Sequence, residues 1–467
     1  MKRMDSGLRT VDPFTISLFI FVMVLVSFLV LIVLTDDPVR RAMLISASLV
    51  SITIMVCFSM MLLRRRMDSR TETLVFVRRC ATLSRFVYAE RMVESYRHRH
   101  AITDRWEGVD SPLISRKEWI PHSLIRLGDV FELNSSFEYI NGYRVAGNGE
   151  KDPKDTVLVE RDMRALLPRP DRYLSYNNKM FLKKNSFDDE LFIIKSIEGD
   201  CNHGKIRMDV RYTSYDHYID TCEFLMLRDV HHMEEGIDGD LTIDLENYNN
   251  RAAGIGVCTL TILRLSDGKD YMLIHHRSDK LGEAPGVISL VPAGSFSPSG
   301  DEEYGVRASQ GHDDAKTPRI IDTIFREFEE EILGSENVEF ATDYERLGIF
   351  HDDNVYYLGM GFDPLTTKME FITALTLNWD LDTCTTVVND CRSRGYEVDD
   401  PKALMTIDGV RRFLDTICSH EGTIRLVEFS RRNVSSYYQN RQCMPVFRAC
   451  MRSMMNDDYR IFNSLHR

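Results

Sequence analysis

The side chains best suited to chemistry are Glu327, Glu330 and Glu331, which follow Arg326 inside a predicted helix over 320–333. Residues three and four positions apart share one side of a helix, so the three carboxylates are predicted to project together. Packing like charges this closely costs helix stability, and a hard divalent cation removes that cost. Mg²⁺ (or Mn²⁺) takes carboxylate and diphosphate oxygens in one coordination shell. An acidic helix that faces solvent is the alternative interpretation.

Elements on both sides of this segment favour the metal-site interpretation. Pro318 near its start and Gly334 just after it are typical helix boundaries. Two apolar runs, 255–263 and 271–275, precede it, and the Ser-Asp-Gly sequence between them is a β-hairpin signal. Gly294, in the sequence Val-Pro-Ala-Gly, lies between the hairpin and the helix.

This arrangement resembles the Nudix box, G-x5-E-x7-R-E-U-x-E-E-x-G-U. The first glycine and the core of the box are matched here by Gly294, Arg326, Glu327, Phe328, Glu330 and Glu331. The resemblance implies a C-terminal Nudix-like α/β/α sandwich with a mixed sheet, in which the glutamates hold Mg²⁺ and Gly294 belongs to the cofactor-binding turn. It also implies that the arginine orients the glutamates by a salt bridge, and that a metal-activated water attacks a nucleoside diphosphate linked to another group.

Two departures bear on the activity. Between Gly294 and Arg326 lie about 18 residues more than the pattern allows, and Pro318 stands where its first glutamate belongs. Leu333 replaces the expected second glycine, with Gly334 one place late. The glutamate triad is intact while the preceding loop is remodelled, so the sequence supports cation binding more directly than pyrophosphohydrolase activity.

The N-terminal part predicts a two-helix transmembrane hairpin. The runs 14–34 and 42–63 contain no charged residue, and each has about the 20 residues that a membrane-spanning helix needs. Basic residues precede the first run and follow the second, which predicts that both termini are cytoplasmic. We therefore expect a multi-pass membrane protein, and the resemblance to bacterial membrane effectors given below implies that this membrane is the bacterial inner membrane. Small residues in the second run suit close helix association, and a homo-oligomer is expected.

The remaining sequence is divided by composition and pattern. Residues 1–70 hold the hairpin, 71–117 a basic juxtamembrane helical linker, 118–250 a strand-rich α+β domain of unknown role, and 251–467 the Nudix-like domain. Further elements are expected as strands at 191–194, 206–210, 371–377 and 424–429 and as helices at 403–418 and 445–455.

Composition excludes some functions. A formal net charge of −13 argues against binding of duplex nucleic acid, which needs a basic surface, but leaves small anionic ligands open. Ten cysteines show neither a disulfide framework nor zinc spacing. Weaker candidates for a site, each with a structural alternative, are His231 and His232 beside Glu234 and Glu235, His351 with Asp352 and Asp353, Glu370, and Cys258.

A hairpin followed by a Nudix-like domain resembles the membrane Nudix effectors of bacterial CBASS anti-phage systems. That resemblance implies a cytosolic region that senses a nucleotide, with a cyclic oligonucleotide as one candidate, and hairpins that cluster and disrupt the inner membrane. The first alternative is a membrane-anchored, Mg²⁺-dependent Nudix hydrolase of a nucleoside-diphosphate-linked compound. The second is a scaffold that binds without chemistry.

Overall fold

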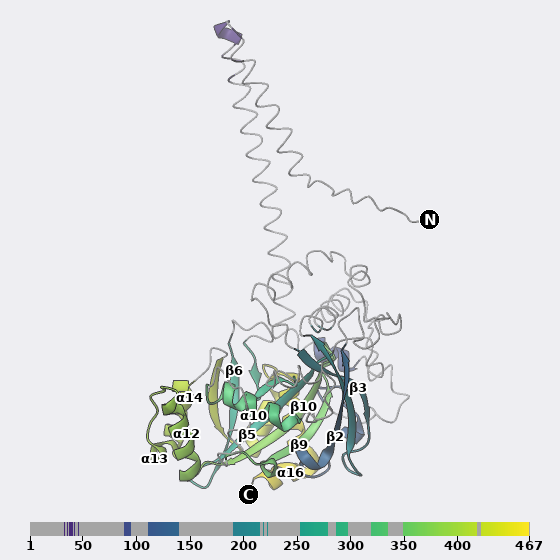
Figure 1. The fold of residues 1–467 in the computed structure, drawn as a ribbon, viewed down its shortest axis with the longest axis vertical. Coiled ribbons are helices and arrows are strands. Elements are labelled where there is room, and N and C mark those ends of the chain that lie inside the picture. The colour runs from purple at the N-terminus through teal and green to yellow at the C-terminus, as the bar shows by residue number, and fades with distance from the viewer. Residues whose placement is uncertain are drawn as a thin grey trace, which may run out of the picture. The chain divides into compact units, whose positions relative to one another are not determined.

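The computed structural model describes residues 88–94, 111–139, 190–214, 253–278, 286–297, 319–334, 349–417 and 422–466, with a few positions between 32 and 45 and positions 218 and 222. The chain divides into two compact units, 1–76 and 77–467. All the strands reported below belong to the second unit (Figure 1).

A mixed sheet of eight strands forms the centre of this unit. Its main path runs β1-β9-β10-β5-β6-β11, with β7 paired to β6 and β8 paired to β5. The strands are β1 (Ile125–Arg126), β5 (Ile255–Arg264), β6 (Asp270–Arg277), β7 (Ile288–Ser289), β8 (Ala293–Ser295), β9 (Val355–Phe362), β10 (Met369–Asn378) and β11 (Gly422–Glu428). Among the described strands of this sheet, β5 and β10 pair in parallel and the other named pairs are antiparallel. Both β5 and β10 are buried along almost their whole length, as expected for strands covered on both faces.

Helices and short 3-10 turns complete the structure around this sheet. They are η1 (Lys117–Trp119), α4 (Leu127–Val130), α10 (Ile320–Glu331), η4 (Asp352–Asn354), α12 (Leu381–Ser393), α13 (Pro401–Leu404), α14 (Ile407–Ile417), α15 (Arg431–Gln439) and α16 (Pro445–Leu465). The apolar side of α16, with Phe447 and Met451, packs in one buried cluster with Leu260 of β5 and Ile372 of β10. Helix α10 instead contacts β8 and β5.

Helix α16 is interrupted near its end. Asn456 leaves the helical conformation, and the next three residues, Asp457, Asp458 and Tyr459, have positive φ angles between 47° and 62°. Left-handed backbone is unfavourable for residues that carry a Cβ, with Asp tolerated better than most. Burial of apolar side chains beyond the break, such as Phe462, offsets this cost.

A second, smaller sheet has the order β2-β4-β3. Its strands are β2 (Phe131–Tyr139), β3 (Glu190–Glu198) and β4 (Ile206–Ser214). It contacts the central sheet directly, because the Phe131 ring packs edge-on against Tyr357 and Phe371 at centroid distances of 5.2 and 5.1 Å. The predicted division at residue 250 remains a prediction.

Most of the expected elements in the described ranges are confirmed. The 255–275 hairpin is β5 and β6, and Gly268 takes a φ of 78° in its turn. The strands predicted at 191–194, 206–210, 371–377 and 424–429 are also present. The helix predicted over 403–418 is divided into α13 and α14, and the helix predicted at 445–455 extends as α16 to Leu465.

The prediction of a transmembrane hairpin is contradicted. Every helix in the part of the chain that the structure describes is too short or too polar to traverse a lipid bilayer. Helix α16 spans 21 residues, but the break at 456–459 divides it into shorter pieces, and it contains arginines and the pair Asp457–Asp458. The predicted runs 14–34 and 42–63 lie almost entirely outside the described residues. The multi-pass inner-membrane location depended on them and is corrected by the same finding.

One carboxylate joins all three strands of the smaller sheet. Asp209 in β4 accepts hydrogen bonds from Ser196 Oγ in β3 at 2.7 Å and from Asn134 Nδ2 in β2 at 3.2 Å. The hydrogen bond from Ser196, opposed by partial burial and assisted by Asn134, lowers the pKa of Asp209 below its usual value. The ionised form therefore stabilises the folded state.

We predict that Asp209→Asn lowers the free energy of unfolding by about 1 kcal/mol at neutral pH, because one charge-assisted acceptor is lost. A lowered pKa in the folded state stabilises fully above the unfolded value of about 4 and loses its effect as the pH falls through the folded value. Urea unfolding between pH 3 and pH 7 measures this, with the exposed Asp408→Asn as control. A deficit that is equal at every pH contradicts the prediction.

Candidate functional site

Helix α10 is positioned by its apolar side. Ile324, Phe325 and Phe328 are buried, and Phe350 stacks on Phe325 at 4.6 Å and meets Phe328 edge-on at 4.9 Å. Aromatic pairs at these distances contribute about 1 kcal/mol each beyond the area they bury. The apolar packing fixes the rotation of the helix and therefore the direction of its glutamates.

Two of the predicted site glutamates are directed at β8. The Glu331 carboxylate accepts a hydrogen bond of 2.9 Å from the backbone N–H of Ala293, 38 positions earlier in the chain. The Glu327 carboxylate lies against Gly294, where a Cβ atom would overlap it. The absence of a side chain at Gly294 thus allows this close approach.

Arg326 joins the site from the same helix. Its guanidinium pairs with Glu327 at 2.8 Å and with Glu330 at 3.4 Å, and it donates to the Ser295 carbonyl oxygen at 3.3 Å. The expected salt bridge between the arginine and the glutamates is therefore present. These contacts hold the Arg326 guanidinium between α10 and the end of β8.

The three glutamates differ in their access to solvent. The side chains of Glu327 and Glu330 are 12% and 40% exposed, whereas Glu331 as a residue is 5% exposed. Among the residues that the structure describes, no group of three or more His, Cys, Asp or Glu side chains is arranged to hold a metal ion. In this arrangement Glu327 and Glu331 are directed at β8, and Glu330 is linked to Glu327 through Arg326.

The turn before β9 contacts the start of α10. Asp352 pairs with Arg319, the residue before the helix, at 2.8 Å, and Asp353 pairs with Arg126 at 2.8 Å. His351 precedes the same turn and is exposed. These contacts fit the structural interpretation of the turn, in which the two carboxylates attach it to its neighbours.

Glu370 lies at the start of β10 with partners of its own. It is buried, Lys368 Nζ is 3.8 Å from it, and Cys258 Sγ donates to it at 3.5 Å. Lys368 and Glu370 both lie over Gly256, where a Cβ would overlap them. The residues His231, His232, Glu234 and Glu235 fall outside the described ranges.

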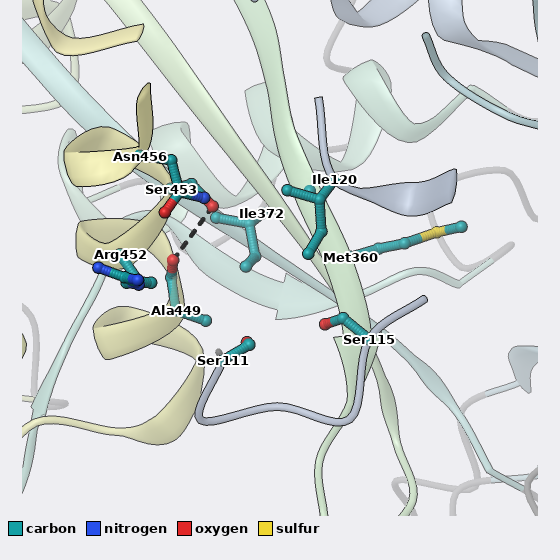
Figure 2. Close-up of a pocket in the computed structure, with 10 residues that line it drawn as sticks. Ser111, Ser115, Ile120, Met360, Ile372, Ala449, Arg452, Ser453 and Asn456 are labelled. Carbon is teal, nitrogen blue, oxygen red and sulfur yellow. Dashed lines mark hydrogen bonds between the residues drawn. The ribbon is translucent and has the colours of Figure 1, made fainter. Parts of the chain in front are cut away.

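A small cavity lies apart from α10, between α16, β9 and β10 (Figure 2). Its volume of about 20 Å³ gives room for one water molecule, and a nucleotide needs more than ten times that space. Ser453, on its wall, donates to the carbonyl oxygen of Ala449 at 3.2 Å. This cavity is therefore not a nucleotide site.

Several contributors to the site gave no sequence signal. The Ala293 N–H and the Ser295 carbonyl are backbone groups, so residue type does not reveal them. Phe350 is remote in sequence from α10 and resembles any core aromatic residue. The inserted segment before α10, 298–318, lies outside the described residues, so the remodelling expected there stays a prediction.

We predict that Gly294→Ala disturbs the site, because its methyl group must displace the Glu327 carboxylate. The atoms that must move are the end of a flexible side chain, so the expected loss in free energy of unfolding is at the lower end of the cost of overpacking, about 1 kcal/mol. Chemical denaturation measures it, and Gly204→Ala is the matched control because a Cβ there meets no atom within 4 Å. Equal stability of the two variants contradicts the close approach.

Comparisons with known proteins do not assign the chain. No protein-family model matches it, and a search of curated proteins gives no match. The function is therefore inferred from the residues and the geometry of the site.

Proposed function

We propose that the described C-terminal region, from residue 253 onward, binds a divalent cation through the glutamates of α10 and hydrolyses a nucleoside-diphosphate-linked compound, as a Nudix-type enzyme does. The observation that carries this proposal is the meeting of Glu327 and Glu331 with Gly294 and Ala293 of β8. The Nudix box contains both this glycine and these glutamates. In the structure Gly294 lies in contact with Glu327, although an insertion separates the two in the sequence.

The donor set suits Mg²⁺ or Mn²⁺. Carboxylate oxygens are the ligands these hard cations prefer, and Glu327, Glu330 and Glu331 would supply them from one helix. A bound cation supplies charge stabilisation for the phosphates and lowers the pKa of a water molecule that it holds. Binding requires that Glu327 and Glu330 exchange part of their pairing with Arg326 for the cation.

The other side chains have distinct roles in this proposal. Arg326 holds Glu327 and Glu330 in place and keeps their charges compensated when no cation is bound. Gly294 leaves the space that the Glu327 carboxylate occupies. The hydrogen bond from Ala293 fixes Glu331, which is buried, while Glu330 is the most exposed of the three glutamates.

Calorimetry with Mn²⁺ and Mg²⁺, followed by chromatographic detection of the nucleoside monophosphate released from a panel of nucleoside-diphosphate-linked compounds, tests the proposal. Glu327→Gln and Glu330→Gln should each reduce metal affinity and turnover by at least the roughly 10- to 100-fold seen when residues supporting a metal ligand are lost. Each substitution keeps the side-chain shape and removes only the charge.

Glu198→Gln provides the control, since Glu198 is exposed and lies in the smaller sheet. It should leave affinity and turnover unchanged. The proposal fails if the wild-type protein takes up neither cation, or if the α10 variants hydrolyse the substrates as fast as the wild type.

A nucleotide sensor without hydrolysis is the second candidate. The observation that favours it is the pairing within the site, where Arg326 contacts Glu327 and Glu330 while the backbone of Ala293 contacts Glu331. Because its carboxylates are already paired, the site can bind a nucleotide without hydrolysing it. A cyclic oligonucleotide is the ligand that the family resemblance suggests.

Titration with cyclic di- and trinucleotides distinguishes the two candidates. A sensor should bind one of them with and without EDTA, return it chemically intact, and keep that affinity in Glu330→Gln. An enzyme should lose turnover in EDTA. Binding that requires Mg²⁺ and ends in cleavage rules out the sensor.

A further inference from the structure

The end of α10 is held by a segment distant in sequence. The carbonyl groups of Leu333 and Gly334, which follow the last residue of α10, lie outside the hydrogen bonds of the helix and need donors from elsewhere. Arg394 Nη1 donates to the Leu333 carbonyl oxygen at 2.9 Å, and the Tyr396 hydroxyl donates to the Gly334 carbonyl oxygen at 2.7 Å. Both donors come from the turn that follows α12.

The turn after α12 is built to present these two groups. Gly395 takes a φ of 88°, and the backbone N–H of Tyr396 returns to the Cys391 carbonyl oxygen at 3.0 Å. Arg394 also pairs with Asp390 one helical turn earlier, which fixes its guanidinium. Its charged group lies 5.7 Å from the Tyr396 ring centre, so the two donors support each other.

The backbone that accepts these two hydrogen bonds is equally constrained. Gly334 has a φ of 68°, and a Cβ at this position would press on Ile417 and the Tyr396 hydroxyl. Glu331, the last residue of α10, is only two positions before Leu333 and is fixed to Ala293 on its other side. The final turn of α10 is thus held between β8 and the α12 turn.

We infer that Arg394 and Tyr396 are positioning residues for the carboxylates of α10. This inference rests on the proposed function, since it assigns the two residues to the support of the same cation site. They touch neither cation nor substrate and act through the backbone at Leu333 and Gly334. Loss of either donor lets the last turn loosen and moves Glu331 away from Glu327.

The variants Arg394→Lys and Tyr396→Phe test this in the full chain. Lysine keeps the charge but lacks the planar fork, and phenylalanine keeps the ring but lacks the hydroxyl. Arg392→Lys is the matched control, because Arg392 also donates to carbonyl oxygens, those of Val398 and Asp399, but away from α10.

The first readout is Mn²⁺ affinity. It is measured by electron paramagnetic resonance under conditions in which the wild type and all variants are folded. Both variants should bind Mn²⁺ about tenfold more weakly or worse, as is typical when support of a metal ligand is lost, while Arg392→Lys binds normally. Saturating Mn²⁺ should restore turnover in both variants. The second readout is hydrogen exchange, which should be faster at the amides of Ile332 and Leu333 in the two variants only.

The outcomes separate the inference from the function on which it rests. If the wild type binds Mn²⁺ and both variants bind it equally well, the positioning role is wrong and the proposed function stands. If exchange at Ile332 and Leu333 is unchanged, the positioning role is wrong whatever the metal data show. If the wild type binds no Mn²⁺, the proposed function fails and the positioning role fails with it.

Discussion

The close approach of α10 to β8 at Gly294 is the contact on which the candidate site depends. A side chain there would occupy the place of the Glu327 carboxylate, which would have to turn aside. The packing of Phe325 and Phe328 against Phe350 holds the helix itself in place, because interiors are close-packed. The glutamates are therefore set by the core beneath the helix and the backbone beside it.

Charge compensation is the second constraint. Three glutamates in two turns of a helix repel one another, and Glu331 is almost wholly buried. Arg326 compensates Glu327 and Glu330, and the Ala293 N–H partly compensates Glu331. A buried carboxylate that accepts hydrogen bonds is tolerable where an isolated one is not. The site is thus stable without a cation, and the proposed cation must compete with Arg326.

The sequence predicted elements formed by neighbouring residues better than it predicted contacts between remote segments. The β5–β6 hairpin follows from two apolar runs and a Gly turn, and α10 follows from its boundaries, since both depend on neighbours in sequence. The parallel pairing of β5 with β10 and the donors Arg394 and Tyr396 depend on contacts between remote segments, which one sequence does not reveal. The transmembrane hairpin was inferred from the length and lack of charge of two apolar runs, whereas the helices that the structure describes are all too short or too polar to cross a bilayer.

The left-handed backbone at the break in α16 restricts which residues related sequences can carry there. At Asp457, Asp458 and Tyr459 the backbone admits glycine or asparagine readily and strongly disfavours valine, isoleucine and threonine. Substitutions at Asp457 and Asp458 would therefore be limited by the backbone torsion angles, and glycine and asparagine would be the most readily accepted residues. An acidic pair retained there could be mistaken for a catalytic signature, although its restricted substitution pattern would record chain geometry.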